Sequence, residues 1–481
     1  MNENSLKTNA QRPAIYDNRL WKCVSVLWLL TVIASFEDGG LLKIQFPGIG
    51  ALYCFRVLLP ITAVCFVIWA IKYRVKVWRD ASTLERWAYV FAAVLIVYGA
   101  VSLSWAIDAS ESFRKLFNLF FDMLFFGLLL QAFHDDILRR KTLRICAVCF
   151  VILLLLGVYE VFYGGLVNDA YEKCFSYYCY FADHRPPVVF SQNTNDYSSS
   201  MVFLFSVFTV YGLFWNFDGK KKIVLTICVS IMVFFLNRAA GARLCFTAFC
   251  VIMIGVLFSL VFRKNGRKRA LLAFGFVLLV CVGIYLGESL HRDRNDSNRL
   301  FFDRYGQEKL SEEFYETDTE TGEKVLRQHN SAGVRARLIL HCFNCIKESH
   351  GLGVGLGNTE SLAEQRAVAV MRDGRRYRSI HCFVARVLSD YGIFAAIPMI
   401  AIGLLLLRSA FLAFRQAIRT GNREALSEAI LFFFMLLTYP VLSTSPSEAQ
   451  DILPMWIFLA FAVWKADDLL KPAEERAAAD A

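Results

Sequence analysis

The segment IVLTICVSIMVFFLNRAAGARLCFTAFCVIMIGVLFSLVF, residues 223–262, decides the fold class of this chain. It consists of two apolar blocks that are separated by the short polar stretch NRAAGAR, residues 237–243. A helix that crosses a bilayer needs about 20 predominantly apolar residues, and each block comes close to that length. The segment therefore predicts a helical hairpin in a membrane.

The same alternation of apolar blocks and polar stretches extends over the whole chain. Of its 481 residues, 56% are hydrophobic and 20% are charged, which is too apolar for a soluble protein. We therefore predict one all-α polytopic membrane domain over residues 1–481, with about 12 transmembrane helices. Their expected centres are Leu29, Val64, Ala93, Phe125, Leu154, Phe205, Val229, Ile252, Val277, Pro398, Met435 and Phe458.

The basic residues predict the topology. Lys and Arg, which give the chain a net charge of +10, cluster at the ends of apolar blocks, a pattern that orients membrane helices and argues against nucleic-acid binding. A model with both termini in the cytoplasm places every basic cluster there. These clusters are residues 72–86, 139–144, 220–222, 263–269 and 408–423.

The longest polar connection, residues 288–380, is then a large periplasmic loop between transmembrane helices 9 and 10. ATP and nucleotide sugars are absent from that compartment. At roughly 90 residues the loop is too long for a simple connector, so we expect it to carry function. Its first part is hydrophilic and is expected to be partly irregular, whereas residues 334–346 fit one face of a helix that SHGLGVGLGN ends.

His381 stands at the start of HCFVARVLSDYGIFAAIPMI, which predicts one helix entering the membrane from the outer side. Because imidazole titrates near neutral pH, His381 is a candidate base for a sugar hydroxyl. The alternative role is a helix cap or a hydrogen bond at the interface.

Four arginines are candidate phosphate ligands. Arg238 and Arg243 lie at the outer end of the predicted hairpin, and Arg335 and Arg337 lie at the start of the loop helix. A guanidinium group binds phosphate oxygens bidentately and keeps its charge, so a diphosphate group is a suitable partner. Alternatively, these side chains extend to lipid phosphates.

Two further sets of residues have two possible roles each. Asn193 and Asn195, before the sixth predicted helix, either contact a sugar or phosphate or cap that helix. Gly353 and Gly355 do not have the spacing of a dinucleotide fingerprint. They either let the backbone approach a headgroup or a neighbouring helix closely, or form a plain turn.

Four motifs, in this order, resemble those of the O-antigen ligase and O-antigen polymerase superfamily of bacterial polytopic glycosyltransferases. They are FSQNTNDY at 190–197, NRAAG at 237–241, VRARLILHCFNCIKESHGLGVGLGN at 334–358 and HCFVARVLSDYGIFAAI at 381–397. The chain departs from the family pattern at Thr194, Asn237, Ile339, His350, Cys382 and Asp390.

The resemblance implies a GT-C-like fold in the bacterial inner membrane, with the active site facing the periplasm. A glycan would move from an undecaprenyl diphosphate carrier to an acceptor hydroxyl. By the same resemblance Arg238 and Arg335, supported by Arg337, would neutralise the leaving diphosphate, and His381 would activate the acceptor. Direct displacement would invert the anomeric configuration, without a cofactor or a metal ion.

Within this superfamily we expect an O-antigen ligase of lipopolysaccharide biosynthesis, which joins the carrier-linked polysaccharide to the lipid A core. An O-antigen or exopolysaccharide polymerase, a growing glycan being its acceptor, remains an alternative, because no residue separates the two. A protein O-oligosaccharyltransferase is a further alternative. Outside the class, a lipid-linked glycan transporter also remains, although the predicted helices contain few of the ionisable residues that transport paths need.

Overall fold

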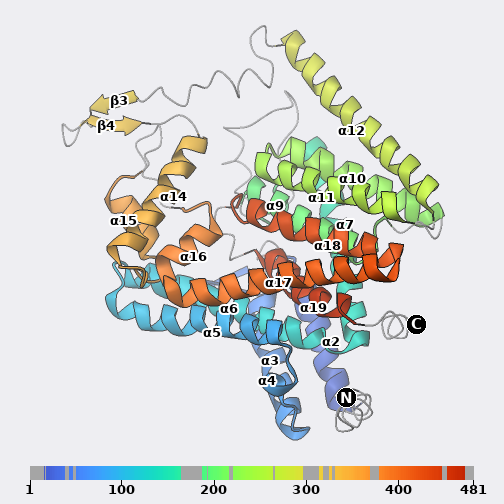
Figure 1. The fold of residues 1–481 in the computed structure, drawn as a ribbon. Helices are drawn as coiled ribbons and strands as arrows, with labels where there is room; N and C mark the ends of the chain where they lie inside the picture. The colour runs from blue at the N-terminus through green and yellow to red at the C-terminus, as the bar shows by residue number, and fades with distance from the viewer. Residues whose placement is uncertain are drawn as a thin grey trace.

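The computed structural model describes residues 16, 18–37, 43–46, 50–163, 187–191, 193–215, 220–263, 266–295, 314–317, 324–327, 331–368, 379–446 and 452–471. Within these ranges the chain is a bundle of helices (Figure 1). The helices of the first half are α2 Arg19–Ala34, α3 Cys54–Lys72, α4 Val77–Asp80, α5 Thr83–Ser102, η1 Leu103–Trp105, α6 Ala109–Ala132, α7 Asp136–Tyr163 and α9 Thr194–Val210. Those of the second half are α10 Lys220–Ala239, α11 Arg243–Phe262, α12 Arg267–Asn295, α14 Ser331–Glu348, α15 Asn358–Gln365, α16 Phe383–Tyr391, α17 Ile393–Thr420, α18 Arg423–Leu442 and α19 Leu453–Leu469.

The helical fold class is confirmed, and each of the twelve expected centres lies inside one of these helices. Among the described residues, eight helices are long and apolar enough to cross a membrane: α3, α5 with η1, α7, α10, α11, α12, α17 and α18. Three others, α2, α9 and α19, contain 16, 17 and 17 residues, slightly short of a full span.

Two short antiparallel hairpins accompany the helices. Strand β1, Lys43–Phe46, pairs with β2, Gly50–Tyr53. Strand β3, Phe314–Thr317, pairs with β4, Lys324–Arg327. The second hairpin lies in the part of the long connection that we expected to be partly irregular, and α12 continues to Asn295, beyond the predicted loop boundary at residue 288.

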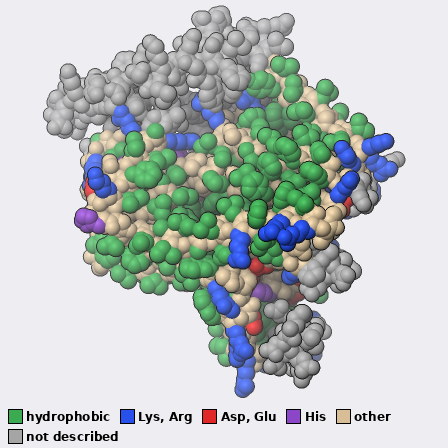
Figure 2. All heavy atoms as spheres, in the orientation of Figure 1, with side chains coloured by type: hydrophobic (Ala, Val, Ile, Leu, Met, Phe, Trp, Pro, Cys, Tyr) green, Lys and Arg blue, Asp and Glu red, His purple; other side chains and the backbone are tan. Residues whose placement is uncertain are grey.

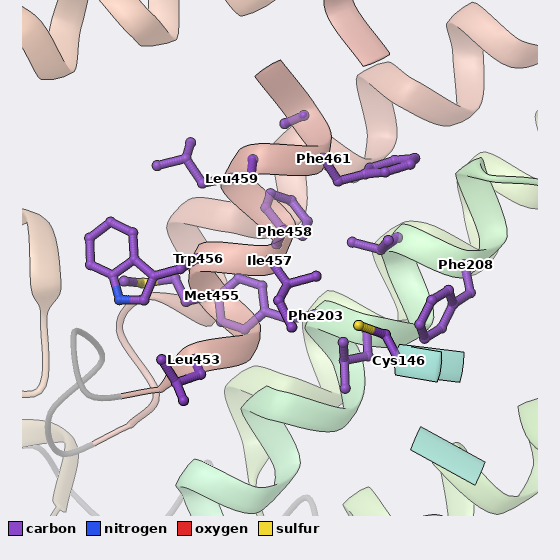
Figure 3. Close-up of a cluster of buried hydrophobic side chains, with 14 of the residues drawn as sticks. Cys146, Phe203, Phe208, Leu453, Met455, Trp456, Ile457, Phe458, Leu459 and Phe461 are labelled. Carbon is purple, nitrogen blue, oxygen red and sulfur yellow. The ribbon is translucent and has the colours of Figure 1, made fainter. Parts of the chain in front are cut away.

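Helices α9 and α19 form the centre of the bundle. Every residue of α9 from Asp196 to Val210 is buried, and in α19 the run from Met455 to Val463 is buried without a break. Figure 3 shows their large side chains together, with Phe203 of α9 beside Ile457 and Phe458. A helix that is apolar all round belongs in the interior.

The outer helices expose apolar side chains. Val64 of α3 is 59% exposed and Leu279 of α12 is 71% exposed, and Figure 2 shows hydrophobic side chains covering much of the visible face of the bundle. Such a continuous apolar surface is typical of contact with lipid.

The segment after His381 is not one helix, so that prediction was wrong. The segment forms α16 and α17, with a break at Gly392, whose φ is +57°. A Cβ atom at Gly392 would lie 2.2 Å from the carbonyl oxygen of Gly351, and Ile393 N donates a hydrogen bond of 2.8 Å to that oxygen. The glycine-rich loop therefore occupies the space that a side chain at position 392 would need.

Candidate functional site

The predicted loop helix is confirmed as α14, which lies with α15 and α16 at one end of the bundle (Figure 1). Its buried side chains Val334, Leu338 and Cys342 recur at helical spacing and pack against Ile380 and Ala385. This packing aligns α14 with the start of α16. The helix face that carries Arg335 is thereby fixed relative to His381.

The glycine-rich loop after α14 is bound to protein backbone. Val354 N donates to Ser389 O, and Gly355 N donates to Asp390 O, each at 2.9 Å. A Cβ atom at Gly353 would lie 2.5 Å from Asp390 O. This geometry matches the predicted role of Gly353 and Gly355 in close approach to a neighbouring helix.

The other side of this loop is bound to the end of α5 and the start of α6. Tyr98 OH donates to Leu352 O at 2.7 Å, and Trp105 Nε1 donates to Val354 O at 3.0 Å. Ser112 Oγ donates to Leu356 O at 2.8 Å. The loop is therefore a clamp that joins three parts of the chain.

Four charged side chains lie buried beneath the clamp: Lys115 of α6, Glu360 of α15, and Arg386 and Asp390 of α16. Their side chains are at most 3% exposed. Glu360 pairs with Lys115 and lies 3.4 Å from Arg386 Nη1, while Asp390 Oδ2 lies 3.8 Å from Arg386 Nε. The group contains two basic and two acidic side chains, and Glu111 Oε1 of α6 lies a further 3.9 Å from Lys115 Nζ, so each buried base faces an acidic partner.

The carboxylate of Asp390 also holds the first turn of α15. Thr359 Oγ1 donates to Asp390 Oδ1 at 2.6 Å, and Gly357 N donates to Asp390 Oδ2 at 3.2 Å. A carboxylate at a helix N-terminus satisfies backbone N–H groups that have no partner within the helix. Asp390, which replaces the glutamate of the family pattern, therefore has a docking role here.

His381 lies in a tight turn immediately before α16. Cys382 N donates to Ile380 O at 2.8 Å, so the two neighbours of His381 in the chain are hydrogen-bonded to each other. Phe383 N donates to Ser443 O at 3.0 Å. The imidazole hydrogen-bonds to the backbone of Ser445 and Pro446, in the turn after α18, and feels the charge of Arg335. His381 is thus enclosed by α14, α16 and the turn between α18 and α19.

Burial and the Arg335 guanidinium lower the pKa of His381 to about 4, although the Ser445 and Pro446 backbone and Glu360 act in the opposite direction. The imidazole is therefore neutral at physiological pH, which is the form that accepts a proton.

A proton acceptor at His381 would therefore give a rate that stays constant from about pH 8 down to about pH 5 and falls only near pH 4, as His381 becomes protonated. An unfolded chain takes up this proton near pH 6.5. The contribution of His381 to folding stability is therefore lost as the pH falls from about 6.5 toward 4. Initial rates across this pH range measure the predicted pH dependence of the rate. A fall in rate near pH 6.5 that is absent in His381→Gln contradicts it.

The candidate arginines fall into two places. Arg335 lies near His381 and also near Cys245 of α11, since its charge acts on both. Arg337 is half-buried on the same helix. Arg238 lies 5.7 Å from the ring centre of Phe246 and 5.4 Å from that of Tyr285, so it is held where α10, α11 and α12 meet. Arg243, at the start of α11, is exposed.

Asn193 caps α9. Its side chain accepts hydrogen bonds from Asn195 N at 2.9 Å and from Asp196 N at 3.0 Å, which matches the capping alternative. The asparagine therefore has a structural role, and Asn195 follows it in the first turn of the helix. The preceding segment is held by Glu160, whose Oε2 accepts from Val189 N at 2.7 Å.

Several residues of this region were not identified from the sequence, among them Lys115, Glu360, Arg386, Cys245 and Ser445. Arg386 and Asp390 have the i, i+4 spacing of a helical ion pair, which is a usable signal of paired charge. Lys115 follows Arg114 in a polar stretch, ESFRK at residues 111–115, and gives no such signal. Nothing local pairs Ser445 with Cys245, which precedes it by 200 positions.

Residues 228–400 match the family model described as O-antigen ligase. This part of the chain is therefore similar to an O-antigen ligase domain. The matched range includes Arg238, Arg335, the glycine clamp and His381, whereas the cap at Asn193 and the turn after α18 lie outside it.

A curated relative of the same superfamily supports this assignment. The chain is 21% identical over 450 residues to the teichuronic acid biosynthesis protein TuaE of Bacillus subtilis (strain 168), and the match covers 92% of this chain and 83% of the relative. Together with the apolar helices, these similarities support a multi-pass membrane enzyme of the O-antigen ligase or polymerase type.

Proposed function

We propose that the protein transfers a glycan from an undecaprenyl diphosphate carrier to an acceptor hydroxyl at the outer face of the bacterial inner membrane. The observation that carries this proposal is the proximity of a neutral His381 to the Arg335 guanidinium, within the matched ligase domain. A proton acceptor beside a fixed positive charge suits a reaction in which a hydroxyl loses a proton while a diphosphate leaves.

In this mechanism His381 accepts the proton of the acceptor hydroxyl as that oxygen attacks the anomeric carbon of the donor sugar. The bond from this carbon to the diphosphate oxygen breaks at the same time, and the configuration inverts. Arg335 and Arg238 bind the departing diphosphate, with Arg337 and Arg243 as further phosphate ligands. The proposal requires no metal ion, because guanidinium groups supply the charge.

The rings of Phe246 and Tyr285 support the role of Arg238. They hold the guanidinium at one place between three helices. A diphosphate group carries the negative charge that a guanidinium group binds bidentately.

We expect Arg335→Ala to lower the transfer rate about 100-fold or more, because the leaving diphosphate loses one of the positive charges that stabilise it. Arg335→Lys should recover only part of this loss, since an ammonium group does not bind bidentately. Arg366→Gln is the matched control, because Arg366 forms an exposed pair with Glu348. Transfer in reconstituted vesicles is the measurement, with excess chelator in a parallel sample. Equal rates in Arg335→Ala and Arg366→Gln contradict the role of Arg335, and a chelator-sensitive rate contradicts metal independence.

We propose the topology predicted from the basic loops: about 12 spans, both termini in the cytoplasm, and residues 288–380 outside. The helix order and the apolar outer surface support it. Single cysteines introduced into residues 318–323 should react with a membrane-impermeant thiol reagent from the periplasmic side alone. Reaction from the cytoplasmic side alone rejects this topology.

Our first choice for the acceptor is the lipid A core, which makes the protein an O-antigen ligase. The polymerase alternative is favoured by one observation: a relative that matches 92% of this chain is a teichuronic acid biosynthesis protein. The lipopolysaccharide ladder of a deletion strain separates the two. Loss of every O-antigen band, with carrier-linked polymer accumulating, indicates the ligase, and a single repeat on the core indicates the polymerase.

A further inference from the structure

The turn between α18 and α19 lies outside the matched ligase domain, but it contacts His381 directly. The imidazole hydrogen-bonds to the backbone of Ser445 and Pro446. Proline has no N–H group, so at Pro446 the carbonyl accepts and the ring N–H donates. A neutral imidazole carries only one such proton, and its second nitrogen is then an acceptor.

The turn is held in place by a chain of buried side chains. Cys245 Sγ of α11 donates to Ser445 Oγ at 3.0 Å, and the same sulfur lies 3.2 Å from Ser199 Oγ of α9. Ser199 and Cys245 are fully buried, and Ser445 is 1% exposed. Helix α11 directly, and α9 through Cys245, therefore fix this turn at one point.

A second contact joins the turn to α16. Phe383 N, in the first turn of that helix, donates to Ser443 O at 3.0 Å, and Ser443 is fully buried. Both the backbone and the imidazole of the His381 segment are thus tied to residues 443–446.

We propose that Ser445 and Cys245 are positioning residues for the reaction. They hold the turn after α18 so that its carbonyl groups fix His381 in one tautomer, with the other ring nitrogen directed to the acceptor hydroxyl. This inference rests on the proposed role of His381. It assigns α11 and the turn after α18 a part in orienting His381.

The proton path is consistent with this arrangement. The ring N–H that faces the turn stays on its nitrogen throughout, and the opposite nitrogen takes the proton of the acceptor hydroxyl. The imidazolium that forms has both nitrogens protonated. The carbonyl groups that accepted from the neutral ring then stabilise its positive charge, as a neighbouring carbonyl or carboxylate does for other histidine bases.

The test is steady-state transfer in vesicles by Ser445→Ala, Cys245→Ala and the double variant. We expect each single change to lower kcat about 10-fold while the KM for the carrier-linked donor changes less than about 3-fold, because only the orientation of the base is affected. In the double variant kcat should also fall about 10-fold rather than about 100-fold, since both residues act through one hydrogen bond. Cys245→Ser, which keeps the donor and the acceptor, should recover most of kcat.

Two controls separate positioning from general destabilisation. Cys146→Ala removes an equally buried thiol from α7, and Ser206→Ala removes a hydroxyl of α9 that donates to Val202 O within its own helix at 2.8 Å. Both should keep kcat. Equal losses of kcat in these controls, or full kcat in Ser445→Ala and Cys245→Ala, overturn the proposal.

A spectroscopic measurement gives an independent readout that does not require activity. In ¹⁵N-histidine-labelled protein, the His381 signals, assigned by their absence in His381→Asn, should show one tautomer in the natural protein and a mixture in Ser445→Ala. One unchanged tautomer in both proteins overturns the proposal. If His381→Ala transfers at the full rate, the proposed function of His381 fails instead, which is a distinct result.

Discussion

His381→Ala is expected to lower glycan transfer about 10²- to 10⁴-fold, the usual contribution of a general base. The side chain is enclosed by three elements and remains neutral at physiological pH, so it is available as a proton acceptor there. Arg335 lies close by but remains protonated. Initial rates with a carrier-linked donor in reconstituted vesicles are the measurement.

His381→Gln makes this test sharper. The glutamine amide can donate to the carbonyl groups of Ser445 and Pro446, but it cannot take up a proton at neutral pH. Low activity in both variants supports the base, whereas high activity in His381→Gln alone assigns a purely orienting role. His350→Asn is the matched control, because His350 is an exposed histidine whose φ of +51° suits asparagine. Full transfer by His381→Ala refutes the proposed role.

Glu360→Ala is expected to destabilise the folded protein by about 3–5 kcal/mol, the cost of breaking a buried ion pair by removing one partner. Glu360 pairs with Lys115 and with Arg386, and both side chains are at most 3% exposed. Its removal leaves Lys115 and Arg386 with the buried Asp390 and with Glu111, whose Oε1 lies 3.9 Å from Lys115 Nζ. Thermal unfolding of the purified protein in detergent measures the loss.

The combined variant Lys115→Met and Glu360→Gln restores neutrality, because Arg386 and Asp390 remain as a pair. It should be more stable than Glu360→Ala, since no net charge stays buried. Arg366→Gln serves as the surface control: its pair with Glu348 is 40% and 49% exposed and should contribute less than about 1 kcal/mol. If Glu360→Ala unfolds at the same temperature as this control, the ion cluster does not stabilise the docking of α15.

The candidate site could be predicted in part. His381, Arg335 and the helix that carries Arg335 follow from local motifs, and in the structure the charge of Arg335 acts on His381. For the glycines the sequence leaves close approach and a plain turn open, and it does not indicate the partner. Gly353 and Gly355 meet the backbone of Asp390, and no periodicity in the sequence relates a loop to the end of a helix more than 30 positions later.

The break at Gly392 illustrates the same limit. The apolar pattern runs on from α16 into α17, so the sequence indicates one helix. The carbonyl of Gly351 takes the hydrogen bond of Ile393 N, and a glycine with positive φ lets the chain turn at that point. A tertiary contact thus overrides a local preference.

The amino-acid sequence by itself determined which segments form the membrane helices. An apolar run of about 20 residues must satisfy its backbone hydrogen bonds internally in lipid, whatever its neighbours are. It also determined the order of the motifs. Only the tertiary structure decided that Lys115 and Arg386 share Glu360, and that the turn holding Ser445 lies against His381. These are contacts between distant segments of the chain, set by how helices pack, and local residue spacing does not encode them.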